Sequence, residues 1–168
     1  MKLRAGAAAL AAAVAASVAV ASGPTPATSP PSPAAKPVVT AALAATAPVR
    51  AAGAGEIVVT LTIADGYHVM SDRPSSEFYI ATRVRFPDAD GVAFAAAIYP
   101  PPREFSLSGR AIATFEGEVR VRLPFTVAAG AAPGERELHG ELSYQACTRS
   151  RCLFPVKAPL VARISVAP

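Results

Sequence analysis

The sequence predicts an all-β protein, an antiparallel β-sandwich that follows an N-terminal leader and a linker. After residue 55, apolar and polar residues alternate in several short runs, which is the pattern of strands with one buried face. Proline and glycine separate these runs, and no segment after residue 55 has the period of a helix. Short strands with turn signals at this spacing are typical of a sandwich, whereas an α/β fold would place helices between the strands.

The first 21 residues have the organisation of a secretory signal peptide. Lys2 and Arg4 form the positive start, an Ala/Val-rich apolar run follows, and Ala19 and Ala21 offer a small-x-small cleavage site. An uncleaved membrane anchor is the alternative, but a run of Ala with few Leu or Phe is weak for spanning a bilayer. No cysteine follows the run, so a lipid anchor has no support. We expect export and removal of residues 1–21.

Without the leader, the charge of the chain is nearly balanced. Sixteen basic and 12 acidic residues give a net charge of +4, and loss of Lys2 and Arg4 leaves 14 basic residues against 12 acidic ones, a net +2. No run of Lys or Arg remains to form a phosphate-binding face, so nucleic acid is not an expected partner. The mature chain keeps two cysteines in a compartment where disulfides persist.

Residues 22–52 are rich in Pro, Ala, Thr and Ser and predict an extended, partly polyproline linker, because this composition cannot bury a core. The globular domain is expected at residues 53–168. Its first strand is the alternating run 57–63, which the turn Asp65-Gly66 ends. Prolines and glycines then separate the later expected strands, which lie at residues 82–86, 119–127, 138–144 and 160–166.

Cys147 and Cys152 bracket a polar turn and come within disulfide distance if the turn folds back. A loop this short would be a poor structural staple, since the chain-entropy model gives roughly 2 kcal/mol for it and about 4.7 kcal/mol for a 100-residue loop. Arg149 and Arg151 lie between the sulfurs, and a nearby cation favours the attacking thiolate. A merely solvated turn explains the arginines equally well. Spacing alone therefore leaves a redox pair and a passive disulfide open.

Metal binding and hydrolysis find little support in the sequence. His68 and His139 are the only histidines, and neither lies at a zinc-type spacing from the cysteines. A blue-copper site needs a His and usually a Met shortly after the Cys, and neither is present there. No Gly-x-Ser-x-Gly elbow marks a serine hydrolase. We expect no metal and no other cofactor.

The segments on both sides of the cysteines resemble a known family. Tyr-Gln-Ala-Cys at residues 144–147 and Cys-Leu-Phe-Pro at residues 152–155 are similar to a motif of the N-terminal periplasmic domain of the DsbD thiol:disulfide interchange proteins. In the expected order, Asp-Gly-Tyr-His at residues 65–68 and the proline-containing segment 99–105 also resemble that domain. The resemblance covers residues 53–168.

The resemblance implies an immunoglobulin-like sandwich in the periplasm, with the cysteines at one end near a sheet edge. Cys152 would attack the partner and Cys147 would resolve the mixed disulfide. The implied partners are thioredoxin-like proteins or disulfide isomerases. Because the sequence ends at Pro168, without membrane helices or a thioredoxin-like domain, we expect either a separate membrane thiol carrier as electron donor or different partners altogether.

A cap over the dithiol is also implied by the resemblance. Glu104 and Phe105 fall where the cap loop of the family begins, with Phe105 as the shielding ring; the alternative is that Phe105 is an ordinary core residue. A ring over the sulfurs would exclude peroxide, because a thiol is oxidised according to its exposure. Tyr67 and His68 would lie near the site, where a histidine can tune thiol protonation. Tyr144 is expected in the core beside it.

The leading hypothesis is an exported thiol:disulfide exchange module that shuttles electrons between a thiol donor and disulfide-containing partner proteins through Cys147 and Cys152. In enzyme terms it would be a protein-disulfide reductase or a component of thiol:disulfide interchange, and the sequence leaves open whether it acts as an enzyme by itself. The alternative hypothesis is a non-catalytic binding or structural sandwich whose disulfide is inert.

Overall fold

A computed structural model of the protein describes residues 36–44 and 47–168. The expected signal peptide and residues 22–35 of the expected linker lie outside the described residues. The described part contains twelve strands and no helix, and hence no helix long and apolar enough to cross a membrane. The strands are β1 (Val39–Ala44), β2 (Val49–Arg50), β3 (Ala54–Ile63), β4 (His68–Met70), β5 (Arg83–Arg85), β6 (Val92–Phe94), β7 (Arg103–Leu107), β8 (Arg110–Phe115), β9 (Glu118–Val127), β10 (Gly134–Tyr144), β11 (Ala146–Cys147) and β12 (Val156–Ala167).

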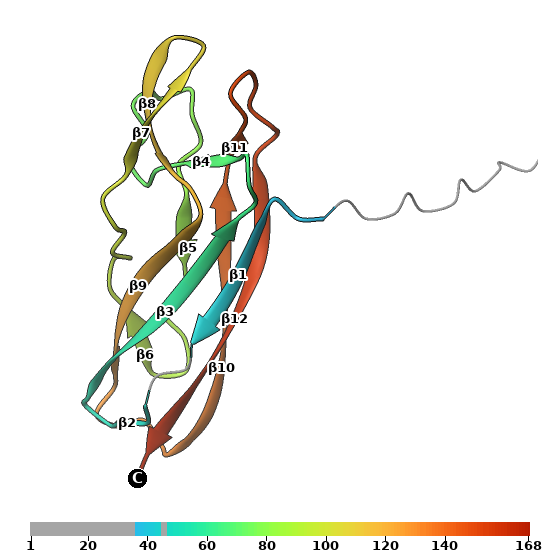
Figure 1. Cartoon of the computed structure of the whole chain (residues 1–168). Helices are drawn as coiled ribbons and strands as arrows, with labels where there is room; N and C mark the ends of the chain where they lie inside the picture. Colours follow the sequence, from blue (N-terminus) through green and yellow to red (C-terminus); the bar gives the residue numbers. More distant parts are fainter. Residues whose placement is uncertain (1–35, 45–46) are drawn as a thin grey trace, which may run out of the picture. The chain divides into compact units, whose positions relative to one another are not determined.

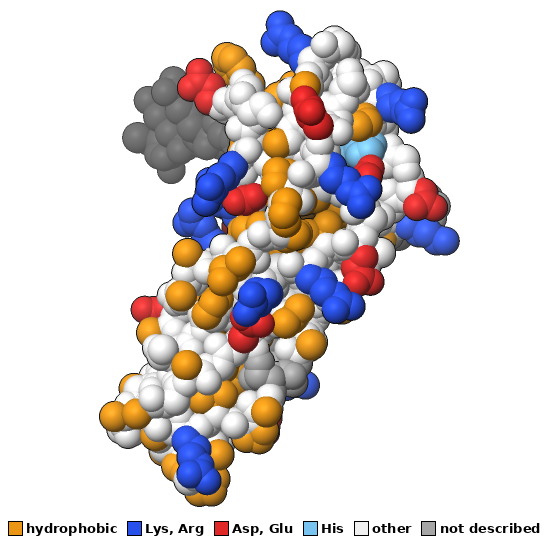
Figure 2. All heavy atoms as spheres, turned by 60° about the vertical axis from the view of Figure 1, so that its left-hand side comes forward, with side chains coloured by type: hydrophobic (Ala, Val, Ile, Leu, Met, Phe, Trp, Pro, Cys, Tyr) orange, Lys and Arg blue, Asp and Glu red, His pale blue; other side chains and the backbone are white. Residues whose placement is uncertain are grey.

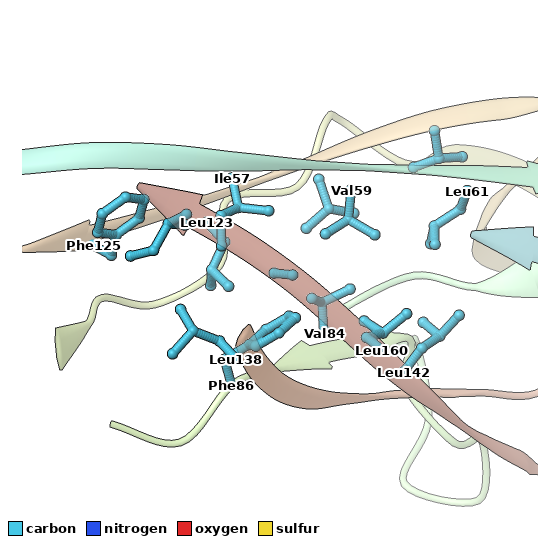
Figure 3. Packing of buried hydrophobic residues seen from close by; sticks show 14 of the residues in the cluster. Ile57, Val59, Leu61, Val84, Phe86, Leu123, Phe125, Leu138, Leu142 and Leu160 are labelled. Atoms are coloured by element: carbon cyan, nitrogen blue, oxygen red, sulfur yellow. The ribbon is translucent and has the colours of Figure 1, made fainter. Parts of the chain in front are cut away.

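Two four-stranded sheets enclose the main core (Figure 1). Their strand orders are β1-β3-β9-β6 and β2-β12-β10-β5. Every second side chain of β9 is buried, as the alternation of a half-buried strand requires. Figure 3 shows Ile57, Leu123 and Phe125 of the first sheet packed with Leu138 and Leu160 of the second. Each such buried side chain contributes about 1.5–3 kcal/mol, so the apolar faces hold the two sheets together.

The expected immunoglobulin-like antiparallel β-sandwich is therefore confirmed, with one exception to the strand direction. The long pairs β3–β9 and β10–β12 are antiparallel over nine and eleven register pairs. Strand β2, by contrast, runs parallel to β12 over two pairs, Val49 with Val166 and Arg50 with Ala167. This short parallel pair makes β2 the edge strand of the second sheet.

The structure differs from the expected linker at its C-terminal end. Strands β1 and β2 both lie before residue 53, where the domain was expected to begin. β1 pairs with β3 from Val39 opposite Ile63 to Ala44 opposite Val58. Three of its six residues are Ala and no strict alternation of apolar and polar residues marks it. Val39 is buried in the main core and Leu43 packs against that core, but most of the other side chains are exposed. Composition alone could not reveal this strand.

A third sheet, of order β11-β4-β8-β7, lies at one end of the sandwich, away from the C-terminus (Figure 1). Strands β7 and β8 form a hairpin whose turn has positive φ at Ser108 (50°) and Gly109 (79°). Two successive residues with positive φ are typical of the tight turn that matches strand twist. Glu104 and Phe105 were expected in a cap loop, but they lie in strand β7 of this hairpin.

Candidate functional site

The two cysteines are joined by a disulfide within a tight hairpin. Their Sγ atoms lie 2.02 Å apart, and Cys147 and Cys152 form an isolated antiparallel bridge. The next pair toward the turn, Thr148 and Arg151, is hydrogen bonded, since the Thr148 N–H donates to the Arg151 carbonyl at 2.8 Å. The cysteines therefore occupy the neighbouring non-hydrogen-bonded position, where antiparallel strands come closest, and their Cα atoms are 3.9 Å apart. Local backbone pairing alone brings the sulfurs together.

The polar turn between the cysteines is closed by its own threonine. The Oγ1 atom of Thr148 accepts the N–H of Ser150 at 3.4 Å and that of Arg151 at 3.3 Å. The same hydroxyl donates to the Arg151 carbonyl at 3.2 Å. The side chains of Arg149 and Arg151 are both exposed. Two cations thus lie at the surface of the turn, in sequence between the two sulfurs.

The two sulfurs differ in exposure. Cys147 is fully buried, whereas Cys152 is partly exposed. Cys147 belongs to a small apolar cluster, separate from the main core, which we call the sulfur cluster. Its buried members are Met70, Leu107, Ile112 and Cys147, and Tyr79, Phe105 and Cys152 pack against them. A protein that approached this end of the sandwich would therefore reach Cys152 first.

Phe105 and His68 both lie beside the cysteine pair. Their rings stack, with centroids 3.7 Å apart and planes inclined by 27°. His68 is also the register partner of Cys147 in the pairing of β4 with β11. Because side chains alternate along a strand, Phe105 faces the sulfur cluster, whereas Glu104 and Ser106 are exposed. The structure thus brings Phe105 and His68 to the cysteines and leaves Glu104 on the other face of β7.

The two tyrosines singled out in the sequence pack against the main core. Tyr144 is buried in it and Tyr67 is half-buried against it. Burial raises the pKa of Tyr144, although a backbone group of Val39 acts in the opposite sense. Tyr144 precedes Cys147 by three residues, so it anchors the strand that leads into the disulfide hairpin. Neither tyrosine belongs to the sulfur cluster.

Gln145 connects the segments around the disulfide, a role that sequence reasoning did not assign. Its Nε2 donates to the Leu153 carbonyl at 3.3 Å, and its Oε1 accepts the N–H of Ile80 at 3.1 Å. The side chain therefore ties the strand before Cys147 both to the chain after Cys152 and to the loop that carries Tyr79. The Tyr-Gln-x-Cys pattern contained this residue, but only the fold shows its partners.

A charged group beside β7 was also missed. Arg103 donates from Nη1 to Oε1 of Glu116 at 2.9 Å. The other carboxylate oxygen, Oε2, lies 3.2 Å from Nδ1 of His68, although the angle between them is not that of a hydrogen bond. The second contact is therefore a close approach without a hydrogen bond. The β7–β8 pairing brings Arg103 to Glu116, and the pairing of β4 with β8 brings His68. Within the described residues, no three His, Cys, Asp or Glu side chains are grouped to hold a metal.

Exposed apolar side chains lie close to Cys152. Phe154, 92% exposed, lines a shallow hollow with Cys152 and Arg151. Phe78, 83% exposed, lies in the loop that Gln145 holds. Large aromatic side chains with this exposure are uncommon on a monomer surface unless they meet a partner. Gln145 bonds to the segments that carry both residues, on either side of the disulfide hairpin.

A further groove lies away from the cysteines and is not part of this site. It runs beside β5, with Phe86, Phe94 and Tyr99 among its lining residues and Arg83 and Arg85 also on its wall. Figure 2 shows one face of the molecule on which hydrophobic side chains gather in the middle, with basic and acidic side chains around them. None of the residues of the sulfur cluster lines this groove.

Comparison with known proteins places the whole site within one family. The family described as thiol:disulfide interchange protein DsbD, N-terminal, matches residues 35–160. This range is three quarters of the chain and contains both cysteines, the β7–β8 hairpin and Gln145 with its two hydrogen-bond partners. Its start at residue 35 also agrees with the position of β1, which lies before the expected domain boundary. No curated protein matches the chain.

Two solved structures are similar to the chain. The N-terminal periplasmic domain of ScsB from Proteus mirabilis is 18% identical, with a TM-score of 0.50, over 73% of this chain and 43% of that one. The DsbD N-terminal domain of Neisseria meningitidis in the reduced form is 19% identical, with a TM-score of 0.45, over 73% of this chain and 90% of that one. The chain thus spans less than half of the ScsB structure, and that likeness supports the fold.

Proposed function

Because the chain belongs to the family of DsbD N-terminal domains, we propose that it carries electrons between a thiol donor and disulfide-containing partner proteins. Thiol:disulfide interchange follows from the family. The assignment of Cys147 and Cys152 as the exchanging pair is supported above all by their different exposure, since Cys147 is fully buried and Cys152 is partly exposed. An exchange site needs one sulfur that a partner can reach and a second, less accessible sulfur that resolves the mixed disulfide.

The chemistry proceeds by two displacements at sulfur. In the reduced module, the Cys152 thiolate attacks one sulfur of the partner disulfide, and the other partner sulfur leaves as a thiolate and takes up a proton. A mixed disulfide results. The Cys147 thiolate then attacks the Cys152 sulfur and displaces the partner as its second thiolate. Two electrons have passed to the partner, and the module is left with the Cys147–Cys152 disulfide.

The cycle needs a donor that reduces the disulfide again. A dithiol protein can do so by the same two displacements in reverse, and we propose a separate membrane thiol carrier in this role. The acceptors would be thioredoxin-like proteins or disulfide isomerases. The similar ScsB structure is a periplasmic domain, and a periplasmic location agrees with the leader-like sequence of residues 1–21.

The surface around Cys152 supports docking of a protein. Exposed Phe154 and Phe78 offer aromatic anchors, which often dominate the energy of an interface. The exposed Arg149 and Arg151 add positive charge at the same turn. Such charges accelerate encounter with a partner of opposite charge more than they raise affinity. A partner with an apolar, acidic rim around its own disulfide fits this surface.

Trapping of a mixed disulfide tests the proposal. Cys147→Ser leaves the accessible Cys152 without its resolving partner, so an extract of the exported proteins should yield a covalent adduct through Cys152. Cys152→Ser is the matched control, since it leaves the buried Cys147 alone, and it should trap little. Mass spectrometry of the non-reduced adduct identifies the joined cysteines. Equal trapping by both variants, or none by either, would contradict the proposed roles.

A further inference from the structure

We propose that Arg103, Glu116 and His68 form a latch that holds the ring of Phe105 against the sulfur cluster, and that the ring thereby covers the disulfide. These three would be positioning residues, because they act on the sulfurs through the ring and not by direct contact. The proposal rests on the exchange function proposed above, since it explains how the pair is kept from reagents other than a docked partner.

The β7–β8 hairpin depends on side chains for its position. In the described part of the chain, β7 is the edge strand of its sheet and pairs only with β8. β8 in turn is joined to β4 by only two register pairs, Val69 with Phe115 and Met70 with Thr114. One further backbone bond, from the Ser71 N–H to the Ala113 carbonyl at 3.0 Å, extends this ladder as far as the position opposite Glu104. The part of the hairpin from Phe105 to the turn lies beyond it. Contacts of its side chains therefore contribute strongly to where the ring lies.

One end of the latch is fixed to the sandwich. Glu116 follows β8 directly, and the carbonyl of the next residue, Gly117, accepts the N–H of Ile63 from β3 at 2.9 Å. The carboxylate is thus anchored to the first sheet through its neighbour. Arg103, at the start of β7, reaches it with an N–O distance of 2.9 Å. The ion pair joins the edge strand of the hairpin to the fixed part of the domain.

The second half of the latch runs through His68 to the ring. Glu116 Oε2 lies 3.2 Å from His68 Nδ1, and the His68 ring stacks on Phe105. Arg103 and Phe105 are two residues apart on β7 and so project from the same face of the strand. The four side chains therefore close a ring of contacts that begins and ends on β7. Lifting Phe105 away from the sulfurs would break the stack and strain the ion pair.

The environment of the latch is only partly screened by water. The side chain of His68 is 13% exposed and that of Glu116 is 37% exposed, whereas Arg103 is 76% exposed. Contacts at half-buried groups are stronger than those between fully exposed charges. Each contact alone is modest, but together they favour the closed position of the ring.

The rate of alkylation of the reduced protein measures how well the ring covers the sulfurs. Iodoacetamide is small and neutral, so its approach to Cys152 needs no partner and is not steered by surface charge. The effect of charge on the thiolate itself is controlled by a second variant that removes a carboxylate nearby. Phe105→Ala removes the ring and so gives the alkylation rate of the uncovered thiol. Glu116→Gln keeps the shape of the side chain but loses the charge that pairs with Arg103. It should raise the alkylation rate roughly two- to fivefold.

Glu118→Gln is the matched control. Glu118 forms an exposed ion pair with Arg120 at 3.1 Å, two residues along the chain, and neither residue belongs to the latch. This variant removes the same charge from nearly the same place and should alkylate at the wild-type rate. Salt at about 0.5 M should speed alkylation of the wild-type protein but not of Glu116→Gln, because only the first has an ion pair to screen.

The double variant Glu116→Gln/Phe105→Ala decides how Glu116 acts. A positioning residue loses its effect when the ring is absent, so the double variant should react no faster than Phe105→Ala. The proposal is overturned if Glu116→Gln and Glu118→Gln alkylate at the same rate. It is also overturned if Glu116→Gln raises the alkylation rate of Phe105→Ala as much as that of the wild type, since Glu116 would then act on the thiol directly. Because no partner takes part, failure of trapping on Cys152 would remove the exchange function and leave the latch standing.

Discussion

Cys147 lies directly opposite His68 in the antiparallel pairing of β11 with β4. The same histidine stacks its ring on that of Phe105, at a centroid distance of 3.7 Å. One side chain is thus the neighbour of both the buried cysteine and the aromatic ring that packs on the sulfur cluster. The disulfide hairpin and the β7–β8 hairpin, which are separate in sequence, meet at this residue.

Removal of the disulfide should cost little stability. The pair Cys147→Ser and Cys152→Ser opens a loop of only six residues, so the chain-entropy model predicts a loss of about 2 kcal/mol. Urea unfolding of the double variant and of the oxidised wild type measures the difference. A loss well above this value would mean that the bridge chiefly holds the fold. The inert-disulfide hypothesis predicts the same small loss and differs in predicting no effect on redox exchange.

Phe154 should matter for exchange and not for folding. It is 92% exposed, so Phe154→Ser should leave the free energy of unfolding nearly unchanged. The reduced domain should reduce the disulfide of a partner identified by trapping on Cys152 about fivefold more slowly, or slower still, once this aromatic anchor is lost. Val161→Ser, at an exposed apolar site on β12, is the control and should not slow this reaction. Equal rates in both variants would exclude Phe154 from the docking surface.

Gly140 should not tolerate a side chain. A Cβ there would lie 2.6 Å from the Arg85 carbonyl oxygen and 2.7 Å from the ring of Phe86, where β10 approaches β5. Gly140→Ala should therefore destabilise the domain by about 1–3 kcal/mol. Gly130→Ala is the matched control, because a Cβ at that position meets nothing within 4 Å. Thermal unfolding compares the two, and equal midpoints would contradict the packing of β10 against β5.

Two tyrosines should make the fold sensitive to alkali. Burial raises the pKa of Tyr99, whose hydroxyl oxygen accepts the N–H of Val84 at 2.7 Å, and burial likewise raises the pKa of Tyr144. Both are neutral in the folded state when free tyrosine ionises, near pH 10. Their contribution to stability is therefore complete below pH 10 and is lost as the pH rises through the folded pKa values.

Ultraviolet absorbance of tyrosinate, followed together with unfolding, measures this effect. The tyrosines of the folded protein should not all titrate near pH 10, and stability should fall above that pH. Tyr144→Phe removes one of the titrating groups and should flatten the fall. If all four tyrosines titrated together with no loss of stability, the burial of Tyr99 and Tyr144 would be contradicted.

The core of the fold was predictable because its strands alternate. Strands β3 and β9 each bury one face against the opposite sheet, so apolar residues recur at every second position of their sequences. β1 escaped prediction because its contribution is mainly backbone pairing, which Ala and Thr provide without any apolar pattern. Its partner β3, in contrast, could be assigned from side chains alone.

The site was predictable only where a motif carried it. The spacing of the cysteines marked them as a redox pair or a passive disulfide, and a resemblance decided between these and added Phe105. The roles of all three residues stay predictions until they are tested. Arg103 and Glu116 could not be found in this way, because their contact depends on the register of the β7–β8 hairpin. The opposite exposures of Cys147 and Cys152 were likewise invisible in the sequence, since both follow from packing on the sulfur cluster.

The redox equilibrium of Cys147 and Cys152 with glutathione tests the central claim most directly. The fraction of dithiol is measured by mass spectrometry after alkylation, over a series of ratios of reduced to oxidised glutathione. An exchange module must be reducible by other thiols, so we predict a midpoint potential above about −300 mV. A disulfide that stays oxidised at every ratio, with a potential below about −300 mV, would be a structural bridge and would contradict the account.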